Sequence, residues 1–421
     1  MQTGSPLDSI PVGCPMHNAS MGHRPFEHEG MYRFFAEVRP EAPVFYSPEI
    51  DYWVLTRRED VLSVIRDYDR FSAVIATQPV CPWPDDMMAF LKEQNFTNEA
   101  VQVACDRPRH TRIRDLAGGF LNMRRFQIYE PAIRKLVQGH ISRMQVKETV
   151  DLVDALTYEL PAQVVFLLLG EESFDPRKIK SWGDLRINLI WGRPSHEEQM
   201  DAARDLLDFW HYATDLVEQR KKYPRDDYPS FLLATRNGDD SVLTENEIKS
   251  LVFGLLLAGH ETTTNAAGNI LLELLRRPQA WKALVDDPTY IPNAVEEGLR
   301  YASSVVAWRR LAKEDVEIGG VQIGKGSKLL LSLGSANRDV SQFEDGETFD
   351  IARGNARSHI AFGNGIHHCI GAPLARLELR IVLEELTAAY PNMKLVEGEE
   401  IHFTATISFR GPDRLLVRPE G

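Results

Sequence analysis

The sequence predicts a mainly α-helical protein with a small β region, folded as a single domain. Residues from about 108 to 300 follow a mainly helical pattern. Short runs of β-branched and aromatic residues precede and follow that stretch, which indicates strands at both ends of the chain. No repeat, low-complexity segment or long linker interrupts the 421 residues, a length that large single-core enzymes reach.

The expected elements follow in chain order. Residues 1–25 contain Gly, Pro and His and are expected to form a flexible N-terminal arm, which leaves 26–421 as the folded domain. A hairpin is expected around 48–50, and Thr244–Glu247 is a capping box that begins a helix. Short strands are expected at 42–47, 51–56, 316–323, 328–332, 403–409 and 414–417.

Composition excludes several classes of protein. The formal net charge of −13 argues against nucleic acid as the main partner. No apolar run reaches the roughly 18–20 residues that span a bilayer, and no basic segment followed by an apolar one indicates a signal peptide. The four cysteines are sparse and irregularly spaced, which suits a reducing compartment. We therefore expect a cytoplasmic protein without a membrane span.

Cys369 is the most informative residue. It lies in a glycine-rich segment, 362–371, that precedes a helix-competent run, and the nearest other cysteine is the distant Cys105. A lone thiolate can serve as the axial ligand of a haem iron, where it favours O–O cleavage. Gly365 and Gly371 would let the backbone pass close to a flat macrocycle. The alternative is a buried structural cysteine in a glycine-rich turn.

The pattern Phe-x-x-Gly-x-x-x-Cys-x-Gly at 362–371 resembles the haem-binding signature of the cytochrome P450 superfamily. The resemblance covers roughly residues 30–420. It implies the cytochrome P450 fold, haem b (iron protoporphyrin IX) as cofactor, and Cys369 as the metal ligand. A zinc site built from Cys369 and its neighbouring histidines is disfavoured, because adjacent residues seldom bind one ion.

A second motif is Ala258–Thr263, which we expect inside a long apolar helix. Gly259, Glu261 and Thr262 are residues that do not favour the stability of a helix interior. Residues that act against the local structure tend to mark functional sites. The segment resembles the oxygen-activation helix of the family. The resemblance implies that Gly259 opens a groove for O₂, Thr262 donates to the bound oxygen and Glu261 relays protons. The alternative is a polar stripe on an amphipathic helix.

Glu297 and Arg300 form an i, i+3 pair that alone would mean little, because such pairs are usually solvated. The pair follows the other motifs in the order found in the family, and it therefore resembles the Glu-x-x-Arg motif of that family. The resemblance gives Arg353 as the third residue of the same network. The implied role is structural: a buried network that holds the cysteine loop.

A haem carries two propionates and needs cations beside them. The family resemblance supplies five candidates at the expected spacing, although each alone would more often be a surface charge or a structural histidine. They are His110, Arg114, Arg310, His359 and His367.

Apolar residues in several segments are candidate walls of a substrate pocket, which would take a small or mid-sized hydrophobic compound. Core packing explains many of them equally well. The candidates are Val74, Phe90, Leu255, Ala258, Val305, Val306 and Ile407.

These features predict a haem-thiolate monooxygenase that uses O₂. Segments at 46–56 and 408–412 resemble haem domains that are elsewhere fused to a flavin and iron–sulfur reductase, and unfused relatives that dealkylate thiocarbamates or aromatic ethers. We expect electrons from a separate ferredoxin-type or flavin/iron–sulfur partner, unless the chain is an excised domain. A basic docking face is expected from Arg109, Arg112, Arg124, Arg125, Arg376 and Arg380. The alternatives are a peroxide-driven peroxygenase and a non-catalytic haem sensor of gas or redox state.

Overall fold

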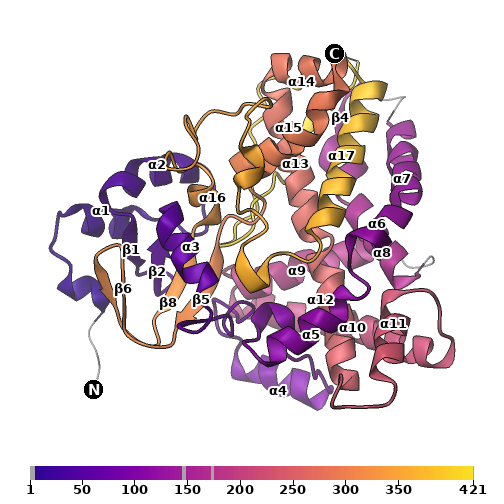
Figure 1. Cartoon of the computed structure of the whole chain (residues 1–421), viewed down its shortest axis with the longest axis horizontal. Helices are drawn as coiled ribbons and strands as arrows, with labels where there is room; N and C mark the ends of the chain where they lie inside the picture. The colour runs from indigo at the N-terminus through magenta and orange to yellow at the C-terminus, as the bar shows by residue number, and fades with distance from the viewer. Residues whose placement is uncertain (1–4, 145–147, 172–174, 421) are drawn as a thin grey trace.

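The computed structural model describes residues 5–144, 148–171 and 175–420. A large helical body lies beside a smaller β-rich region, so the expected fold class is confirmed (Figure 1). In chain order the α-helices are α1 Pro15–Gly22, α2 Met31–Glu41, α3 Arg58–Arg66, α4 Asp85–Glu93, α5 Arg109–Gly118, α6 Met123–Ile128, α7 Glu130–Ser142, α8 Leu160–Leu169, α9 Pro176–Trp191, α10 His196–Lys222, α11 Tyr228–Arg236, α12 Glu245–Ala258, α13 Glu261–Leu275, α14 Pro278–Asp286, α15 Ile291–Tyr301, α16 Leu333–Ala336 and α17 Ala372–Ala389.

Short helical turns and strands complete the fold. The turns are η1 Pro6–Ser9, η2 Gln102–Ala104, η3 Val153–Thr157, η4 Pro288–Tyr290, η5 Ala356–Ser358 and η6 Gly365–His367. The strands are β1 Val44–Ser47, β2 Tyr52–Leu55, β3 Phe71–Ser72, β4 Val150–Asp151, β5 Trp308–Ala312, β6 Val316–Ile318, β7 Val321–Ile323, β8 Lys328–Leu331, β9 Lys394–Leu395 and β10 Leu416–Arg418.

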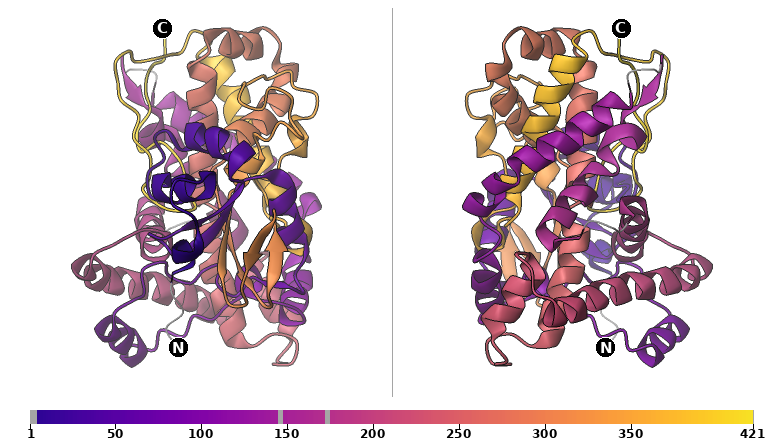
Figure 2. Two further views of the ribbon diagram at one scale, coloured as in Figure 1. Left: turned by 90° about the vertical axis from the view of Figure 1, so that its left-hand side faces the viewer. Right: turned by 90° about the vertical axis from the view of Figure 1, so that its right-hand side faces the viewer.

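The main sheet joins segments from the two ends of the chain. Its strand order is β1-β2-β8-β5-β3. The expected hairpin is confirmed by β1 and β2, which pair antiparallel with Val44 opposite Leu55. Strand β8 then runs parallel to β2, and the two lie side by side in the left view of Figure 2. Because all residues of β1 and β2 are buried, this sheet has its own apolar core.

Helix α13 lies in the interior of the helical body. It packs against α14, α15, α17, α8 and α9. Every residue of α13 except Thr262 is buried. The expected capping box is present one helix earlier, where the Thr244 hydroxyl accepts from Glu247 N and the Glu247 carboxylate accepts from Thr244 N. The sequence therefore fixes the start of α12, and burial on all sides holds α13.

Two expectations differ from the structure. The segment expected to be a flexible arm includes α1, which packs on β1, and Ile10 and Ala19 are buried. Its apolar residues therefore cover the small sheet from residue 5 onward. Residues 403–409 do not form the expected strand with 414–417. They make only isolated bridges, and β10 pairs instead with β4 and β9, two short strands that carry little sequence signal.

Among the described residues, no helix combines the length and apolar character needed to cross a bilayer.

Candidate active site

The Cys369 loop is held in a turn that precedes α17. Gly363 and Gly365 have φ values of 72° and 68°, which disfavour residues with a side chain. Cys369 N donates to Phe362 O at 2.9 Å and closes the loop. The φ angle of Gly371 is −83°, which lies outside the left-handed region, so the backbone conformation there does not require glycine. A Cβ there would lie 3.8 Å from the Cys369 sulfur.

The Cys369 side chain is exposed, yet the surrounding protein desolvates its sulfur. This desolvation raises the pKa of the thiol, while hydrogen bonds from the backbone of Gly371 and Ala372 and the charge of Arg114 oppose the rise. A coordinating metal ion deprotonates a thiol outright. The sulfur is therefore accessible, and the backbone donors and Arg114 partly offset the burial that disfavours its thiolate.

The Ala258–Thr263 segment does not lie inside one continuous helix as expected. Helix α12 ends at Ala258, and α13 begins at Glu261. A Cβ on Gly259 would lie 2.5 Å from a methyl group of Val165 and 3.1 Å from Leu255 O. Gly259 is thus required because α8 packs closely against the break. The Thr262 hydroxyl donates to Ala258 O at 3.0 Å, across that break.

Glu261 is buried and forms an ion pair with Lys180 of α9. Lys180 also pairs with Asp184, and Tyr158 donates a hydrogen bond to Asp184 at 2.9 Å. Side-chain exposure is 5% for Glu261 and 3% for Lys180, but 43% for Asp184. Burial raises the pKa of Glu261, with Asp184 adding to the rise and Lys180 opposing it. The three charged groups therefore connect the interior to the surface.

Sequence reasoning missed Lys180 and Asp184. They lie about 80 positions before Glu261, on a helix whose pattern carries no motif. Their i, i+4 spacing is common on exposed helix faces and gives no signal of a buried partner. Only the packing of α9 against α13 reveals the network.

The structure brings Glu297, Arg300 and Arg353 together. Arg300 donates to both oxygens of Glu297, at 2.7 and 2.8 Å, and both side chains are fully buried. Arg353 Nε donates to the same carboxylate at 3.3 Å. Arg300 also donates to Asn337 O and Gly346 O, and Arg353 donates to Glu344 O. The network thus ties α15 to the segment 337–353.

Four of the five expected propionate-binding residues cluster. The rings of His110 and His367 lie 4.3 Å apart. Burial lowers the pKa of His367, and Arg310 and Arg114 are close enough to lower it further. Both ring nitrogens of His110 and Nη2 of Arg310 are buried and have no hydrogen-bond partner among the described residues. A buried polar group without a partner is costly. The cluster is therefore built to meet an anion.

His359 differs from the other four. Its Nε2 lies 3.0 Å from Glu296, and its Nδ1 accepts from Ala361 N at 3.1 Å. Arg376 donates to the same Glu296 at 2.7 Å. Both ring nitrogens of His359 are thus already engaged within the protein, an outcome that sequence spacing could not reveal.

The candidate pocket walls fall into three places. Ala258 is exposed and Leu255 half-buried near the C-terminal end of α12, so this part of the helix borders open space. Val305, Val306 and Ile407 lie together, because Val306 N donates to Ser408 O and Val305 bridges Phe409. Val74 is 41% exposed, whereas Phe90 of α4 packs against the helical core. Phe90 and Leu255 pack against the same apolar cluster of the helical body.

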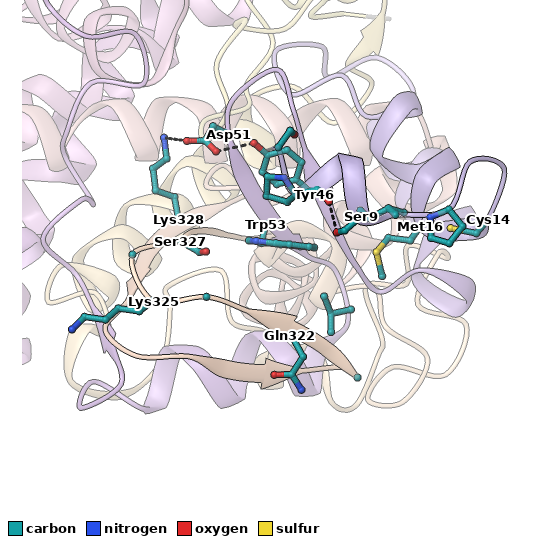
Figure 3. Close-up of a pocket in the computed structure, with 18 residues that line it drawn as sticks. Ser9, Cys14, Met16, Tyr46, Asp51, Trp53, Gln322, Lys325, Ser327 and Lys328 are labelled. Atoms are coloured by element: carbon teal, nitrogen blue, oxygen red, sulfur yellow. Dashed lines mark hydrogen bonds and ion pairs between the residues drawn. The ribbon is translucent and has the colours of Figure 1, made fainter. Parts of the chain in front are cut away.

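A cavity of about 870 Å³ lies elsewhere, against the small sheet. Trp53 and Met16 contribute apolar surface to it, and Lys325 and Lys328 contribute charge (Figure 3). None of the predicted site residues lines this cavity. Its size alone does not make it the active site, because the chemical groups lie elsewhere.

Comparison with known proteins decides the family. The family model described as Cytochrome P450 matches residues 157–391, more than half of the chain. The chain belongs to the cytochrome P450 family. This P450 is 34% identical to Cytochrome P450 107B1 of Saccharopolyspora erythraea, over 88% of this chain and 90% of the relative. It is 32% identical to the 6-deoxyerythronolide B hydroxylase of the same organism, over 94% and 97%.

Solved structures agree with this assignment. The P450 matches cytochrome P450 CREJ in complex with (4-ethylphenyl) dihydrogen phosphate, with a TM-score of 0.92 and 37% identity over 94% of this chain and 99% of that one. It also matches an intact type IV self-sufficient cytochrome P450 monooxygenase, with a TM-score of 0.92 and 36% identity. That match covers 97% of this chain but 54% of the other, as expected from the resemblance to fused haem domains.

As a P450 monooxygenase, the protein binds iron protoporphyrin IX. The residues present fit this group. The accessible Cys369 sulfur can bind the iron, and His110 and Arg310, beside Arg114 and His367, offer the propionates buried side-chain nitrogens that have no hydrogen-bond partner among the described residues. The haem would thus provide partners for the Cys369 sulfur and for buried donors that lack a hydrogen bond among the described residues.

The expected basic docking face is largely neutralised. Arg109 and Arg112 both pair with Glu247, and Arg125 pairs with Asp226. The remaining pairs are Arg376 with Glu296 and Arg380 with Glu130. Sequence spacing suggested a positive excess, but carboxylates from distant segments compensate these charges. Steering of an acidic donor by these arginines is correspondingly weakened.

Proposed function

We propose that this P450 inserts one oxygen atom of O₂ into a small or mid-sized hydrophobic substrate, by hydroxylation or by O-, N- or S-dealkylation. When bound, the haem supplies the binding and activation of O₂. The observation that carries the proposal is Thr262, which is the only residue of α13 that is not buried and which adjoins the Glu261 network. A hydroxyl and an acid at such a place can deliver protons.

We infer a proton path from the surface to Thr262. Asp184 takes up protons from solvent, Lys180 lies between the two carboxylates, and Glu261 carries the proton inward. Delivery requires the Glu261 carboxyl to leave Lys180 and turn toward the Thr262 hydroxyl. The raised pKa of Glu261 suits this role, because an acid that releases protons near neutral pH is the more effective relay.

The other site residues receive supporting roles in this proposal. Cys369 would bind the haem iron, and His110, Arg114, Arg310 and His367 would hold the propionates. His359 acts through Glu296 and braces the cysteine loop. Glu297, Arg300 and Arg353 hold the segment 337–353 in place.

The substrate would meet Leu255 and Ala258 on one side and Val305, Val306 and Ile407 on another. These apolar walls suit a compact hydrophobic compound. The CREJ structure holds an ethylphenyl phosphate, and we infer that aromatic compounds of that size fit here as well. Val74 and Phe90 remain candidates for the outer part of the substrate-pocket wall.

We infer that electrons come from a ferredoxin-type or flavin/iron–sulfur partner. Structural neighbours include self-sufficient monooxygenases, which supports a donor of this kind. All four cysteines are free, which suits a reducing compartment, so we place the protein in the cytoplasm. We further propose that residues 26–421 form the monooxygenase domain, with α1 of the preceding segment packed on its strand β1.

The structure disfavours two other functions. A peroxide-driven peroxygenase has no need of a proton relay, and a haem sensor has no need to deliver protons to bound oxygen. The solvent-linked network of Asp184, Lys180 and Glu261 disfavours both.

Thr262→Ala tests the proposal. Haem content and reduction should stay near the wild-type values, because the change trims one small side chain. Product formed per NAD(P)H should fall by about 100-fold, the lower end of what positioned proton transfer contributes, and hydrogen peroxide should account for the lost reducing equivalents. Added peroxide should restore part of the product.

Thr263→Ala is the matched control, because Thr263 is buried and donates to Gly259 O. It should stay coupled. A fully coupled Thr262→Ala enzyme would show that this hydroxyl serves only the helix.

Lys180→Met tests the buried ion pair. Without Lys180, the pKa of Glu261 should rise further, because burial then acts unopposed. A carboxyl whose pKa is higher in the folded state stabilises the fold below its unfolded-state pKa, and this contribution is lost as pH rises through the folded value. The variant should therefore lose stability progressively as pH rises above the usual pKa of glutamate, as measured by urea unfolding. Buried Glu378, whose pKa burial raises to about 8, contributes a loss of the same sign in every variant, so the measured quantity is the loss in excess of that of the native protein. Adding Glu261→Gln should remove this excess, and an excess that persists in the double variant would contradict the assignment.

A further inference from the structure

His260 lies at the break between α12 and α13, and its imidazole is fully buried. The residue is 0% exposed, and neither ring nitrogen has a hydrogen-bond partner among the described residues. Burial and the charge of Lys180 hold the pKa of His260 well below its usual value, so the imidazole is neutral. Because a buried polar group without a partner is costly, a histidine here calls for a contact that forms in another state of the site.

The surroundings of His260 differ from those of other buried histidines. Both ring nitrogens of His140 lie 2.9 Å from an oxygen acceptor. The unpaired nitrogens of His110 belong to the cluster that fits the haem propionates. His260 instead has Gly183 and Glu261 as neighbours, so the propionates do not account for its unpaired nitrogens.

The Glu261 carboxyl lies beside the imidazole, with Oε2 3.9 Å from His260 Nδ1. Lys180 contacts the same oxygen, and Asn265 Nδ2 donates to the other at 3.3 Å. An ammonium and an amide N–H are donors, so both suit the carboxylate form of Glu261. The protonated form, which carries the proton in the proposed path, has an O–H that needs an acceptor.

Two acceptors face this carboxyl among the described residues. Burial raises the pKa of Glu261, and the nearby Asp184 adds to the rise. Asp184, however, already accepts hydrogen bonds from Lys180 and Tyr158. The other acceptor is His260 Nδ1, because a neutral imidazole has a lone pair on one nitrogen. A displacement of the carboxyl by about 1 Å would bring Oε2 within hydrogen-bond distance of it.

Gly183 of α9 makes room for the imidazole. A Cβ at position 183 would lie 2.9 Å from His260 Nε2 and closer still to the neighbouring ring carbon. Gly183 stands between Lys180 and Asp184, so the helix that carries the ion pairs also receives the imidazole. A glycine inside a helix lowers its stability relative to alanine. The contact with His260 gives this glycine a physical reason.

We propose that His260 is a positioning residue of the proton relay, whose Nδ1 accepts the hydrogen bond of the protonated Glu261 carboxyl. This role rests on the proposed monooxygenase function and adds a residue to its proton path. Lys180 holds the carboxylate form of Glu261, and His260 holds the acid form after it has left Lys180. The proton stays on Glu261 until the carboxyl turns toward Thr262.

His260→Leu tests this role by removing the acceptor. The acid form of Glu261 then loses a hydrogen bond while the carboxylate form keeps Lys180, so the pKa of Glu261 should fall. One neutral hydrogen bond corresponds to a shift of about half a pH unit to one unit. Infrared titration of the carboxyl C=O band, assigned by its loss in Glu261→Gln, measures the midpoint.

His260→Asn is the conservative variant. Asparagine is close to leucine in size, and its Oδ1 can occupy the place of Nδ1 as an acceptor. The midpoint of this variant should lie between those of His260→Leu and the native protein. His28→Leu is the matched control, because both ring nitrogens of His28 are also buried and lack a partner among the described residues. It should leave the Glu261 midpoint unchanged.

The other ionisable groups around the relay are the same in every variant, and Glu261→Gln leaves their signals in place. They are Lys180 and Asp184 on α9, Tyr158 before α8, Asp413 near Asp184, and Glu378 on α17.

Two results would overturn the proposal. A Glu261 midpoint that stays or rises in His260→Leu would mean that the imidazole only fills space or donates to the carboxylate. Nitrogen-15 NMR of the native protein, recorded below the Glu261 midpoint, should show the His260 proton on Nε2, with the signal assigned by its loss in His260→Asn. A proton on Nδ1 under these conditions contradicts the proposal even if His260→Leu does not fold.

The product formed per NAD(P)H separates this role from the proposed function. A Glu261→Gln enzyme that stays fully coupled contradicts the relay itself. An uncoupled Glu261→Gln enzyme, together with an unmoved midpoint in His260→Leu, contradicts the role of His260 alone.

Discussion

Cys369→Ser should abolish the strongly red-shifted absorbance band of the CO-bound ferrous protein. That band requires a thiolate bound to the haem iron, and a serine hydroxyl would not donate electron density in the same way. Cys369 is the one cysteine of the chain that is exposed in the glycine-rich loop before α17. The effect should be complete, because no second sulfur lies in that loop. Absorbance difference spectra of the reduced protein with and without CO measure it.

Cys81→Ser is the matched control. This substitution also replaces a cysteine sulfur by an oxygen, but in a half-buried cysteine that precedes α4, away from the glycine-rich loop. This variant should keep the band at full intensity. A Cys369→Ser protein that retained the band, or a native protein that never bound haem, would falsify the ligand assignment.

Arg300→Leu should destabilise the fold by about 3–5 kcal/mol, the usual cost of leaving one charge of a buried pair without its partner. That loss is a large share of the roughly 5–15 kcal/mol by which proteins of this kind are stable. Glu297 would keep Arg353 at 3.3 Å but lose both hydrogen bonds from Arg300. Carbonyls of the segment 337–353 would also lose their donors. Denaturant unfolding and haem content after purification measure the effect.

Arg33→Leu serves as the control for the same substitution. Arg33 pairs with Glu37 at i, i+4, but the two side chains are 84% and 63% exposed. Exposed pairs contribute about 0–1 kcal/mol, so this variant should unfold almost as the native protein does. Similar losses in the two variants would mean that burial of the Glu297 pair does not matter. Arg300→Lys should fall between the two, because it restores the charge without the bidentate geometry.

Local patterns predicted the parts of the fold that depend on neighbours in sequence. The capping box at Thr244 and the hairpin of β1 and β2 are formed by residues a few positions apart, so the sequence alone locates them. The Glu297–Arg300 pair likewise follows from i, i+3 spacing on one helix. Where a strand depends on distant partners, as at 403–409, the local pattern was misleading.

The arrangement of charges was beyond the reach of sequence patterns. The arginines expected to form a basic face meet Glu247, Asp226 and Glu296, which come from elements far along the chain. His359 matches the expected spacing but is held by Glu296. A charge at a familiar position therefore does not reveal which partner neutralises it.

The sequence by itself determined the chemistry of this protein: a lone cysteine in a glycine-rich loop, an acid–alcohol pair and a Glu-x-x-Arg motif each need only residues close together in the chain. The tertiary structure alone decided how those groups are arranged and which partners they contact. It broke the helix at Gly259 and His260 and joined Glu261 to Lys180 and Asp184. The physical reason is that burial and long-range ion pairing depend on which helices pack together. Neither quantity is encoded in the spacing of any single segment.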